Sequence, residues 1–173
     1  MTERTSRQLN DVNLEAIGAL IEKIRQEPQA AKTQWKADVR WTGALRSEAR
    51  SRDLRPSPSD EPSGLGGSNT APNPVEQLLA ALGNCLAVGY AANATVAGIQ
   101  IRSLRIELEG AIDLRAFLGL GGENAGYESI RATVDLDSDA SPEQLKQLHE
   151  KVVGSSPVGH TLSRGVPLRI ELR

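Results

Sequence analysis

Residues 73–90 read NPVEQLLAALGNCLAVGY and contain Cys85, the only cysteine of the 173-residue chain. Asn73 can cap a helix here, because a proline follows at the first helical position and Glu76 completes a capping box. Beyond this start, apolar and small residues recur at three- and four-residue spacing, which predicts one helix about 35 Å long that ends near Val96. We expect this helix to be buried at the centre of a soluble fold.

A membrane span is the alternative for this stretch, because the chain is nearly uncharged from Leu78 to Ile99. Asn84, Tyr90 and Asn93 make the segment only mildly apolar, so we expect no membrane association. The first ten residues, MTERTSRQLN, are polar and lack the apolar stretch of a signal peptide. Since a single cysteine cannot form an internal disulfide, the predicted location is cytoplasmic.

Composition narrows the classes of function. The net charge of −2 and the sequence pI near 5.8 provide no basic surface for a nucleic-acid partner. One cysteine and two histidines lack the spacing of metal ligands, and the glycine-rich stretches GLGG and GLGGEN lack the context of a phosphate-binding loop. His149 falls on a charged helix and is expected in solvent. We therefore expect one domain without metal or cofactor.

The segments that flank the central stretch mix strand and helix patterns without a regular βαβ alternation, which favours the α+β class. Apolar residues at helical spacing predict an early helix that stops at Pro28, and a capping box at Ser141 and a second Ser-Pro start at Ser156 predict two later helices. The apolar parity slips at Ser103–Leu104, which predicts a bulge. Alternating patterns predict strands over residues 35–41, 99–113, 127–137 and 166–173.

Residues 48–72 differ in composition from the rest of the chain, because they are rich in Arg, Ser, Pro, Asp and Gly. A stretch of this length without an element of its own is unusual inside a compact domain. Its polar content offers little apolar surface to offset the entropy of ordering, so we expect a mobile loop. The predicted organisation is an N-terminal helical extension over residues 1–30 and one domain over residues 31–173.

Four segments, in this order, resemble the OsmC/Ohr family. They are a Gly-Gly pair at 66–67, NPVEQLLAALGNCL at 73–86, AGYESIRATVDLDSDASPEQLKQL at 125–148, and SSPVGHTLSRGVPLRIEL at 155–172. The ordered pair P-x-E-x-L-L-A-A-L-x-x-C and S-P-V-x-x-T-L is the specific part. The resemblance extends from Trp35 to Arg173. It implies an OsmC-like α+β fold in which strands pack on two central helices and two chains intertwine as a homodimer.

The resemblance also implies a chemistry for Cys85. Family members with complete sites reduce organic hydroperoxides through a peroxidatic cysteine on the central helix, and a second cysteine resolves the sulfenic acid as a disulfide. Cys85 matches the peroxidatic position, whereas the resolving position, immediately before Pro157, is Ser156. A hydroxyl cannot form a disulfide, so a sulfenic acid at Cys85 would need an external thiol reductant.

Complete family sites hold the thiolate with an arginine from the early β region and a glutamate at the start of the central helix. Arg46 is the best match for the arginine, with Arg50 and Arg52 as competing positions. The acidic position lies ten residues before the cysteine, where this chain has Val75. Glu76 comes one residue later, about 100° around the helix, and capping is the stronger interpretation of its role.

Two functions remain open at this point. The first is thiol-dependent reduction of organic hydroperoxides in peroxide-stress defence, with Cys85, Arg46 and Glu76 as catalytic residues. The second is a non-catalytic homodimer that binds a small apolar ligand in an interface pocket lined by Ser156 and His160. Local features alone favour an unreactive thiol, because free cysteine is among the most buried residue types. Oxidation of Cys85 by an organic hydroperoxide in the intact protein separates the two functions.

Overall fold

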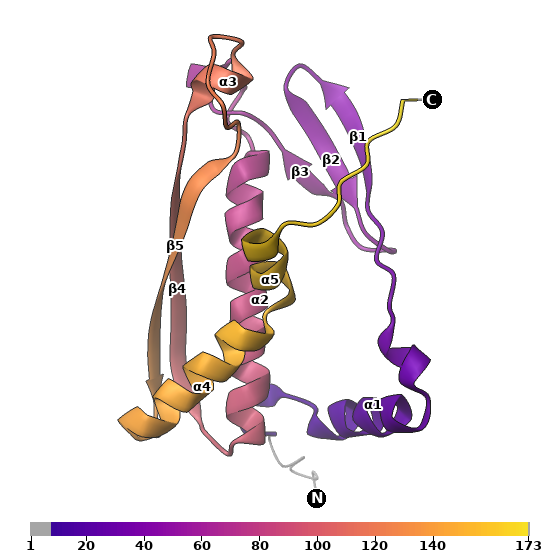
Figure 1. The fold of residues 1–173 in the computed structure, drawn as a ribbon, viewed down its shortest axis with the longest axis vertical. Helices are drawn as coiled ribbons and strands as arrows, with labels where there is room; N and C mark the ends of the chain where they lie inside the picture. Colours follow the sequence, from indigo (N-terminus) through magenta and orange to yellow (C-terminus); the bar gives the residue numbers. More distant parts are fainter. Residues whose placement is uncertain (1–7, 173) are drawn as a thin grey trace, which may run out of the picture. The chain divides into compact units, whose positions relative to one another are not determined.

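The computed structural model describes residues 8–172, whose elements mix helices and strands as the α+β prediction requires (Figure 1). The described residues divide into two compact units, one of residues 8–13 with 79–172 and the other of residues 14–78. The long helix α2, Pro74–Val96, starts in the second of these units and continues through the first. Each unit is described by itself below.

The unit of residues 14–78 contains the early helix and a three-stranded antiparallel sheet of order β1-β2-β3. The early helix ends just before Pro28, as predicted. The first strand begins at Asp38, three residues later than the alternating pattern predicted, so Trp35 lies outside it. The elements are α1 (Leu14–Gln26), η2 (Pro28–Ala31), β1 (Asp38–Gly43), β2 (Arg46–Arg50), β3 (Ser57–Ser59) and η3 (Ser63–Leu65).

The polar stretch 48–72 is organised around one carboxylate. Asp60 is 1% exposed and accepts hydrogen bonds from the backbone N–H groups of Glu61, Ser68 and Thr70, and from the hydroxyl of Thr70 at 2.8 Å. The stretch therefore contains β3 and η3, which the apolar pattern could not reveal because hydrogen bonds replace apolar burial here. The mobility of residues 48–72 stays a prediction.

The start of α2 is built as the sequence predicted. The Asn73 side chain accepts from the Glu76 N–H at 2.9 Å, and the Glu76 carboxylate accepts from the Asn73 N–H at 2.8 Å, which completes the capping box. The helix stops at Val96, and Gly98, with a φ of +72°, supplies the left-handed turn that follows. By length and composition α2 could cross a membrane, a test that the core helix of a soluble protein also passes.

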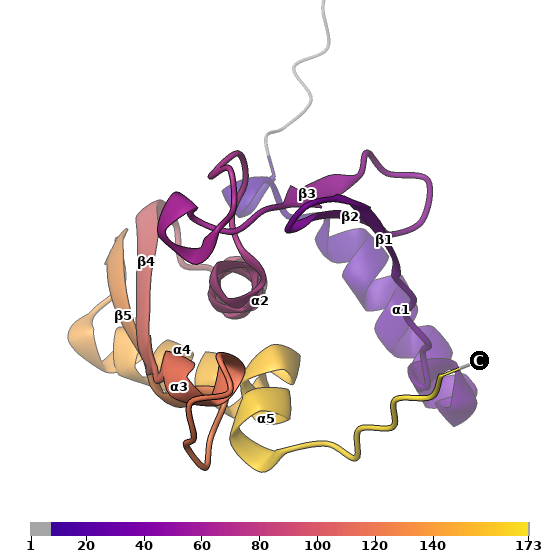
Figure 2. The same ribbon diagram turned by 90° about the horizontal axis from the view of Figure 1, so that it is seen from above.

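The other unit packs the greater part of α2 against a β-hairpin and a later helix (Figure 2). The hairpin is a two-stranded antiparallel sheet, and a short helix lies in its connection. The core consists of Leu86, Tyr90 and Ala94 of α2, Ile99 of the connection that follows it, and Leu148 and Val152 of the later helix. The elements are η1 (Leu9–Asp11), β4 (Ile101–Ile112), α3 (Leu114–Phe117), β5 (Tyr127–Ser138), α4 (Pro142–Ser155) and α5 (Pro157–Arg164).

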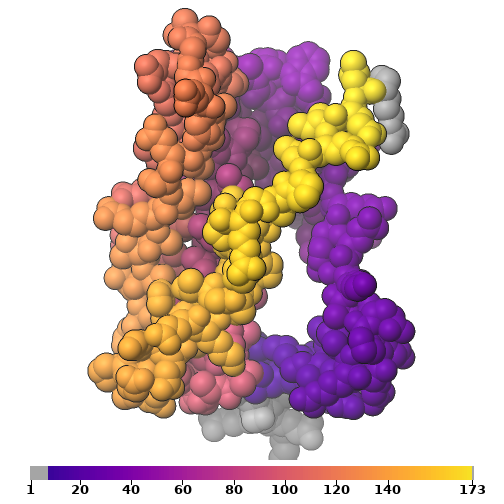
Figure 3. Space-filling view, viewed as in Figure 1, coloured from indigo at the N-terminus to yellow at the C-terminus, as the bar shows by residue number. Residues whose placement is uncertain are grey.

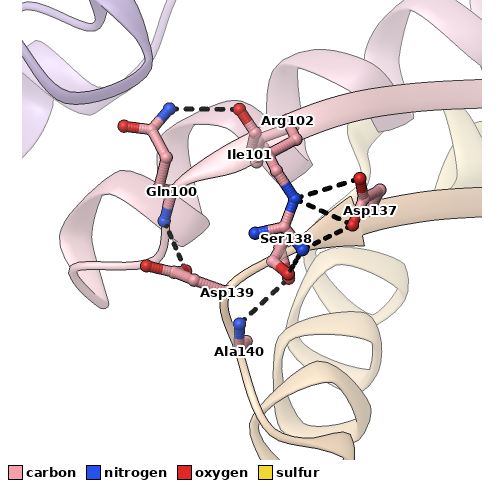
Figure 4. Close-up of polar contacts among 7 residues, drawn as sticks. All are labelled: Gln100, Ile101, Arg102, Asp137, Ser138, Asp139 and Ala140. Atoms are coloured by element: carbon pink, nitrogen blue, oxygen red, sulfur yellow. Dashed lines mark hydrogen bonds and ion pairs between the residues drawn. The ribbon is translucent and has the colours of Figure 1, made fainter.

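A bulge lies at the start of β4, close to the predicted slip in parity. The pairing with β5 shifts register between Ile101 and Ser103. Figure 4 shows the side chain of Arg102, at the bulge, pairing with Asp137 and donating to the carbonyl of Ser138. The bulged residue thus ties the two strands together through its side chain where one ladder bond is lost.

Asn10 fastens the segment before α1 to the end of α2 and the start of β4. Its amide nitrogen donates to the Thr95 hydroxyl at 3.0 Å and to the Ile99 carbonyl at 2.9 Å. Its amide oxygen accepts from the Ile101 N–H at 2.9 Å and from the Gln100 side chain at 3.1 Å. One side chain therefore uses all of its hydrogen-bonding capacity.

The predicted C-terminal strand is wrong for the single chain. Residues after α5 pair with no strand within residues 8–172, and Figure 3 shows this segment in yellow as a thin run of chain. Its alternating apolar side chains are exposed, with Leu168 and Ile170 at 82% and 87%. The strand pattern is present in the sequence, but a strand requires a partner with which to exchange backbone hydrogen bonds.

Candidate functional site

Cys85 lies in the middle of α2 as a free, half-buried thiol. Its Sγ atom is 3.3 Å from Oγ of Ser156, which lies 71 positions later in the sequence. Both residues belong to the unit that contains α4 and α5. The structure therefore brings together the two positions at which the resemblance implied a peroxidatic and a resolving residue.

Ser156 is placed by the junction of two helices. It follows α4 directly and is the N-cap of α5, where its Oγ accepts from the Gly159 N–H at 3.1 Å, as the Ser-Pro start predicted. The serine is 5% exposed. A Cβ atom on Gly159 would lie 3.0 Å from Oγ of Ser156, so glycine is what lets this first turn close tightly over the serine.

The distance between the two residues is held by the packing of α2 on α4. A Cβ on Gly89 would lie 3.0 Å from Cγ1 of Val152, so the glycine permits a close approach of the two helices. Tyr90 is 1% exposed, and its hydroxyl is 2.5 Å from Nδ1 of His149. The position of Ser156, at the end of α4, is thus fixed relative to Cys85 by apolar contacts and a polar bond.

His149 is exposed to solvent, as expected, but its ring also bonds to buried Tyr90, which the expectation did not include. The sequence did indicate that Tyr90 would need a hydrogen-bond partner. Tyr90 is four residues from both Leu86 and Ala94, so it falls on the buried face of α2, and a buried tyrosine hydroxyl normally finds a partner.

His160 lies on the first turn of α5, half-buried. Its backbone N–H donates to the carbonyl of Ser156 at 2.9 Å, which is a bond of the helix rather than of a ligand site. A pocket-lining role for its ring stays a prediction.

Arg46 and Glu76 belong to the other compact unit, so their catalytic roles also stay predictions. Arg46 is the exposed first residue of β2. Glu76 is engaged as a helix cap, which confirms the structural role that the sequence favoured for it. Of the competing arginines, Arg50 pairs with Glu48 at 2.9 Å.

The face of α2 that carries Cys85 continues as an apolar stripe. Ala81, Val88, Ala92 and Val96 follow at three- and four-residue spacing around the cysteine. Val88 is 69% exposed and Val96 is 60% exposed. The thiol therefore lies on a largely apolar surface that the single chain leaves open.

One concave surface of this unit lies away from Cys85. A cavity of about 700 Å³ is bounded by residues 8–11, by Ala87 and Ala91 of α2, and by the start of β4. None of Cys85, Ser156 and His160 lines it. Among residues 8–172, no group of three or more His, Cys, Asp or Glu side chains could hold a metal ion.

Solved structures define the class of fold. An OsmC-like protein from Mycoplasma pneumoniae superposes with a TM-score of 0.66 at 18% identity, over 78% of this chain and 90% of that one. An organic hydroperoxide resistance protein from Elizabethkingia anophelis gives 0.57 at 19% identity, over 78% and 92%. An organic hydroperoxide resistance protein OsmC from Legionella pneumophila gives 0.54 at 18% identity, over 78% and 93%. The fold is therefore OsmC-like.

The sequence itself identifies the family. The sequence model of the OsmC-like proteins matches residues 66–171, more than half of the chain. This protein therefore belongs to the OsmC-like family, as the order of its motifs indicated. No curated protein matches the sequence.

Proposed function

We propose that this protein reduces organic hydroperoxides through Cys85, with an external thiol as reductant, as part of a cell's defence against peroxides. The observation that supports this most directly is the 3.3 Å contact between Cys85 Sγ and Ser156 Oγ. The contact joins the residues at the two positions that the resemblance assigns to a redox pair. Family membership and the hydroperoxide resistance proteins of the same fold point in the same direction.

The first half of the reaction oxidises the thiol. Cys85 loses its proton to solvent, and the thiolate attacks one oxygen of the peroxide bond. The O–O bond breaks, the leaving alkoxide takes the electron pair and a proton to become an alcohol, and Cys85 becomes a sulfenic acid. Arg46 and Glu76 are the residues that we assign to hold the thiolate, and this assignment rests on the resemblance alone.

The second half returns the thiol. An external thiol attacks the sulfenic sulfur and releases water, which leaves a mixed disulfide on Cys85. A second equivalent of thiol attacks this disulfide and regenerates Cys85, while the two reductant molecules leave joined as a disulfide. Ser156 cannot take part in this exchange, so the reductant must come from outside. Thiol pools of this kind are maintained in the cytoplasm, where we place the reaction.

We further propose that the active form is a homodimer of intertwined subunits. The exposed stripe around Cys85 and the unpaired apolar C-terminal segment both lack cover in the single chain. The hairpin β4–β5 is a sheet of only two strands, and such sheets are marginal without further packing. A folded monomer in sedimentation at micromolar concentration would contradict this proposal.

Mass spectrometry of the intact protein tests the chemistry. One equivalent of cumene hydroperoxide should add one oxygen atom at Cys85, and this sulfenic acid should persist until a thiol is added. Excess peroxide should drive it to sulfinic acid, which thiols do not reverse. If Cys85 stays a thiol under peroxide that oxidises free cysteine, the enzyme is refuted and the ligand-binding homodimer becomes the leading function.

A variant that supplies the missing residue sharpens this test. Ser156→Cys should form an internal disulfide with Cys85 after one equivalent of peroxide, provided that the two Cα atoms are within the roughly 4.4–6.8 Å that bridging requires. Ser155→Cys is the matched control, because it adds a cysteine one position earlier, at the exposed end of α4. Only Ser156→Cys should lose both of its thiols to an internal disulfide, without any external thiol attached to the protein.

A further inference from the structure

We propose that Ser156 is a positioning residue for Cys85: its hydroxyl donates a hydrogen bond to the sulfur and holds the thiolate at the N-terminus of α5. The inference rests on the proposed function, because it takes the Cys85 thiolate as the reacting group. It gives the serine a role of its own at the position where complete family sites carry the resolving cysteine.

The ionisation of Cys85 determines which atom is the donor, since by geometry alone either Sγ or Oγ could donate. A serine hydroxyl has one hydrogen and two lone pairs. The Gly159 N–H occupies a lone pair of Oγ at 3.1 Å, which leaves the hydroxyl hydrogen free to point at Sγ of Cys85 at 3.3 Å. A thiolate has no hydrogen to donate, so with an ionised Cys85 the serine must be the donor.

The serine is held in this orientation from three sides. It is the residue at which α4 ends and α5 begins, so its backbone is fixed by two helices. Its side chain is almost fully buried, and Gly159 leaves little room beside it, since even a Cβ atom there would lie 3.2 Å from the serine Cβ. A donor that cannot turn away is already placed before the sulfur ionises.

The helix that Ser156 caps, α5, also favours a negative charge on the Cys85 sulfur. α5 has eight residues, and its first backbone N–H groups carry the partial positive charge of a helix N-terminus. Pro157, at the first helical position, has no N–H, and the Gly159 N–H is taken by the serine oxygen. The hydroxyl therefore relays the positive end of α5 to the sulfur, because a bond that Oγ accepts strengthens the bond that it donates.

The test measures how fast iodoacetamide alkylates Cys85 from about pH 5 to about pH 10, on both sides of the ordinary range for a thiol. In the full-length Ser156→Ala protein, the midpoint of the rise in rate should move to higher pH, while the plateau at high pH should not fall, because a thiolate without this hydrogen bond is at least as nucleophilic. Consumption of cumene hydroperoxide near pH 7 should fall roughly tenfold, the scale of one hydrogen bond to a charged group. Ser156→Thr keeps a hydroxyl and should restore both midpoint and rate.

Two further variants separate this effect from damage to the fold. Ser156→Gly also removes the hydroxyl, but glycine is accepted as an N-cap, so it serves if the alanine variant does not fold. Ser141→Ala is the matched control, because Ser141 caps α4 in the same unit with a complete capping box. It removes a cap without altering the residue that contacts the sulfur, and its alkylation midpoint should equal that of the unmodified protein.

The outcomes distinguish this inference from the proposed function. A shifted midpoint in a protein that does not consume hydroperoxide would support the positioning role and refute the enzyme. An unchanged midpoint in the folded alanine or glycine variant would overturn the positioning role, whether or not hydroperoxide is consumed. An equal shift in Ser141→Ala would also overturn it, because the effect would then come from loosening of the helices.

Discussion

Asp60 and Cys85 are both polar groups withdrawn from bulk solvent, one in each compact unit, and their surroundings differ. The Asp60 carboxylate accepts bonds from three backbone N–H groups and one hydroxyl, so its capacity is largely used by its own loop. The Cys85 sulfur is half-buried and has one hydroxyl beside it. A group whose bonds are used by the fold stabilises the fold, whereas a group with capacity left over is available for chemistry.

Replacing the thiol should have the largest effect of all. Cys85→Ser should reduce thiol-dependent consumption of cumene hydroperoxide by at least roughly a hundredfold, because an alcohol is a far weaker nucleophile than a thiolate at neutral pH. Asn84→Ser is the matched control, since it places a serine at an exposed position of α2 next to Cys85, outside the apolar stripe, and should retain activity. Equal loss in both variants would show that any change in this part of α2, and not the loss of the thiol, removes activity.

Removing the carboxylate of Asp60, the other group in this comparison, should lower the stability of the protein. Asp60→Ala leaves several buried donors without an acceptor, so the melting temperature should fall by on the order of 5 °C or more, with hydroperoxide chemistry at Cys85 retained. Limited proteolysis should then cut within residues 48–72. Asp53→Ala, at an exposed position in the same stretch, should change neither result. A melting temperature that stays the same would contradict the structural role of Asp60.

Lowering the pH should reproduce part of the destabilisation expected for Asp60→Ala, because acid protonates the carboxylate of Asp60. Burial alone would raise the pKa of Asp60, but the hydrogen bonds from Thr70, Ser68 and Glu61 outweigh it and hold this pKa below its ordinary value. Since the folded pKa is the lower one, the stabilisation is present above about pH 4 and is lost as the pH falls through the folded pKa. Thermal unfolding between about pH 2 and pH 6 should therefore show a steeper loss for the unmodified protein than for Asp60→Asn.

Tyr90 gives the smallest expected effect, because its partner His149 can turn to solvent. Tyr90→Phe should lower the free energy of unfolding by about 1 kcal/mol, the net contribution of one hydrogen bond. Burial raises the pKa of Tyr90. Its contribution is then complete below about pH 10 and is lost as the pH rises through the folded pKa. Chemical denaturation at neutral and alkaline pH measures the free energy of unfolding and its dependence on pH. Identical curves for Tyr90→Phe and the unmodified protein would refute the expectation.

What could be predicted from the sequence follows from the range of the interactions. The caps at Asn73 and Ser141 were predictable because each depends on residues three positions apart. The Asp60 cluster was not, because its donors lie up to ten positions away in a polar stretch without periodicity. The C-terminal pattern predicted a strand, since alternation reports which face is apolar and says nothing of a partner strand.

The candidate site shows the same limit. Helical spacing placed Cys85 on a face of α2, but nothing local could place Ser156 beside it from 71 positions away. That pairing came from the resemblance to a family, and the structure confirms it as a contact. The burial of Tyr90 was predictable from its spacing, whereas its choice of His149 depended on how α4 crosses α2. Roles for Arg46 and Glu76 remain predictions.

The bonds of Asn10 have a consequence for the order in which the chain folds. They join positions 85 to 91 residues apart, so residues 11–94 form a loop whose two ends meet at one amide group. Closing a loop of this length in an unstructured chain costs about 4 kcal/mol of entropy, and four hydrogen bonds of about 1 kcal/mol each only offset that cost, so they add no net stability until the chain between them has folded. We therefore expect Asn10 to dock last, and pulsed hydrogen exchange should show the Ile101 amide gaining protection after the rest of β4.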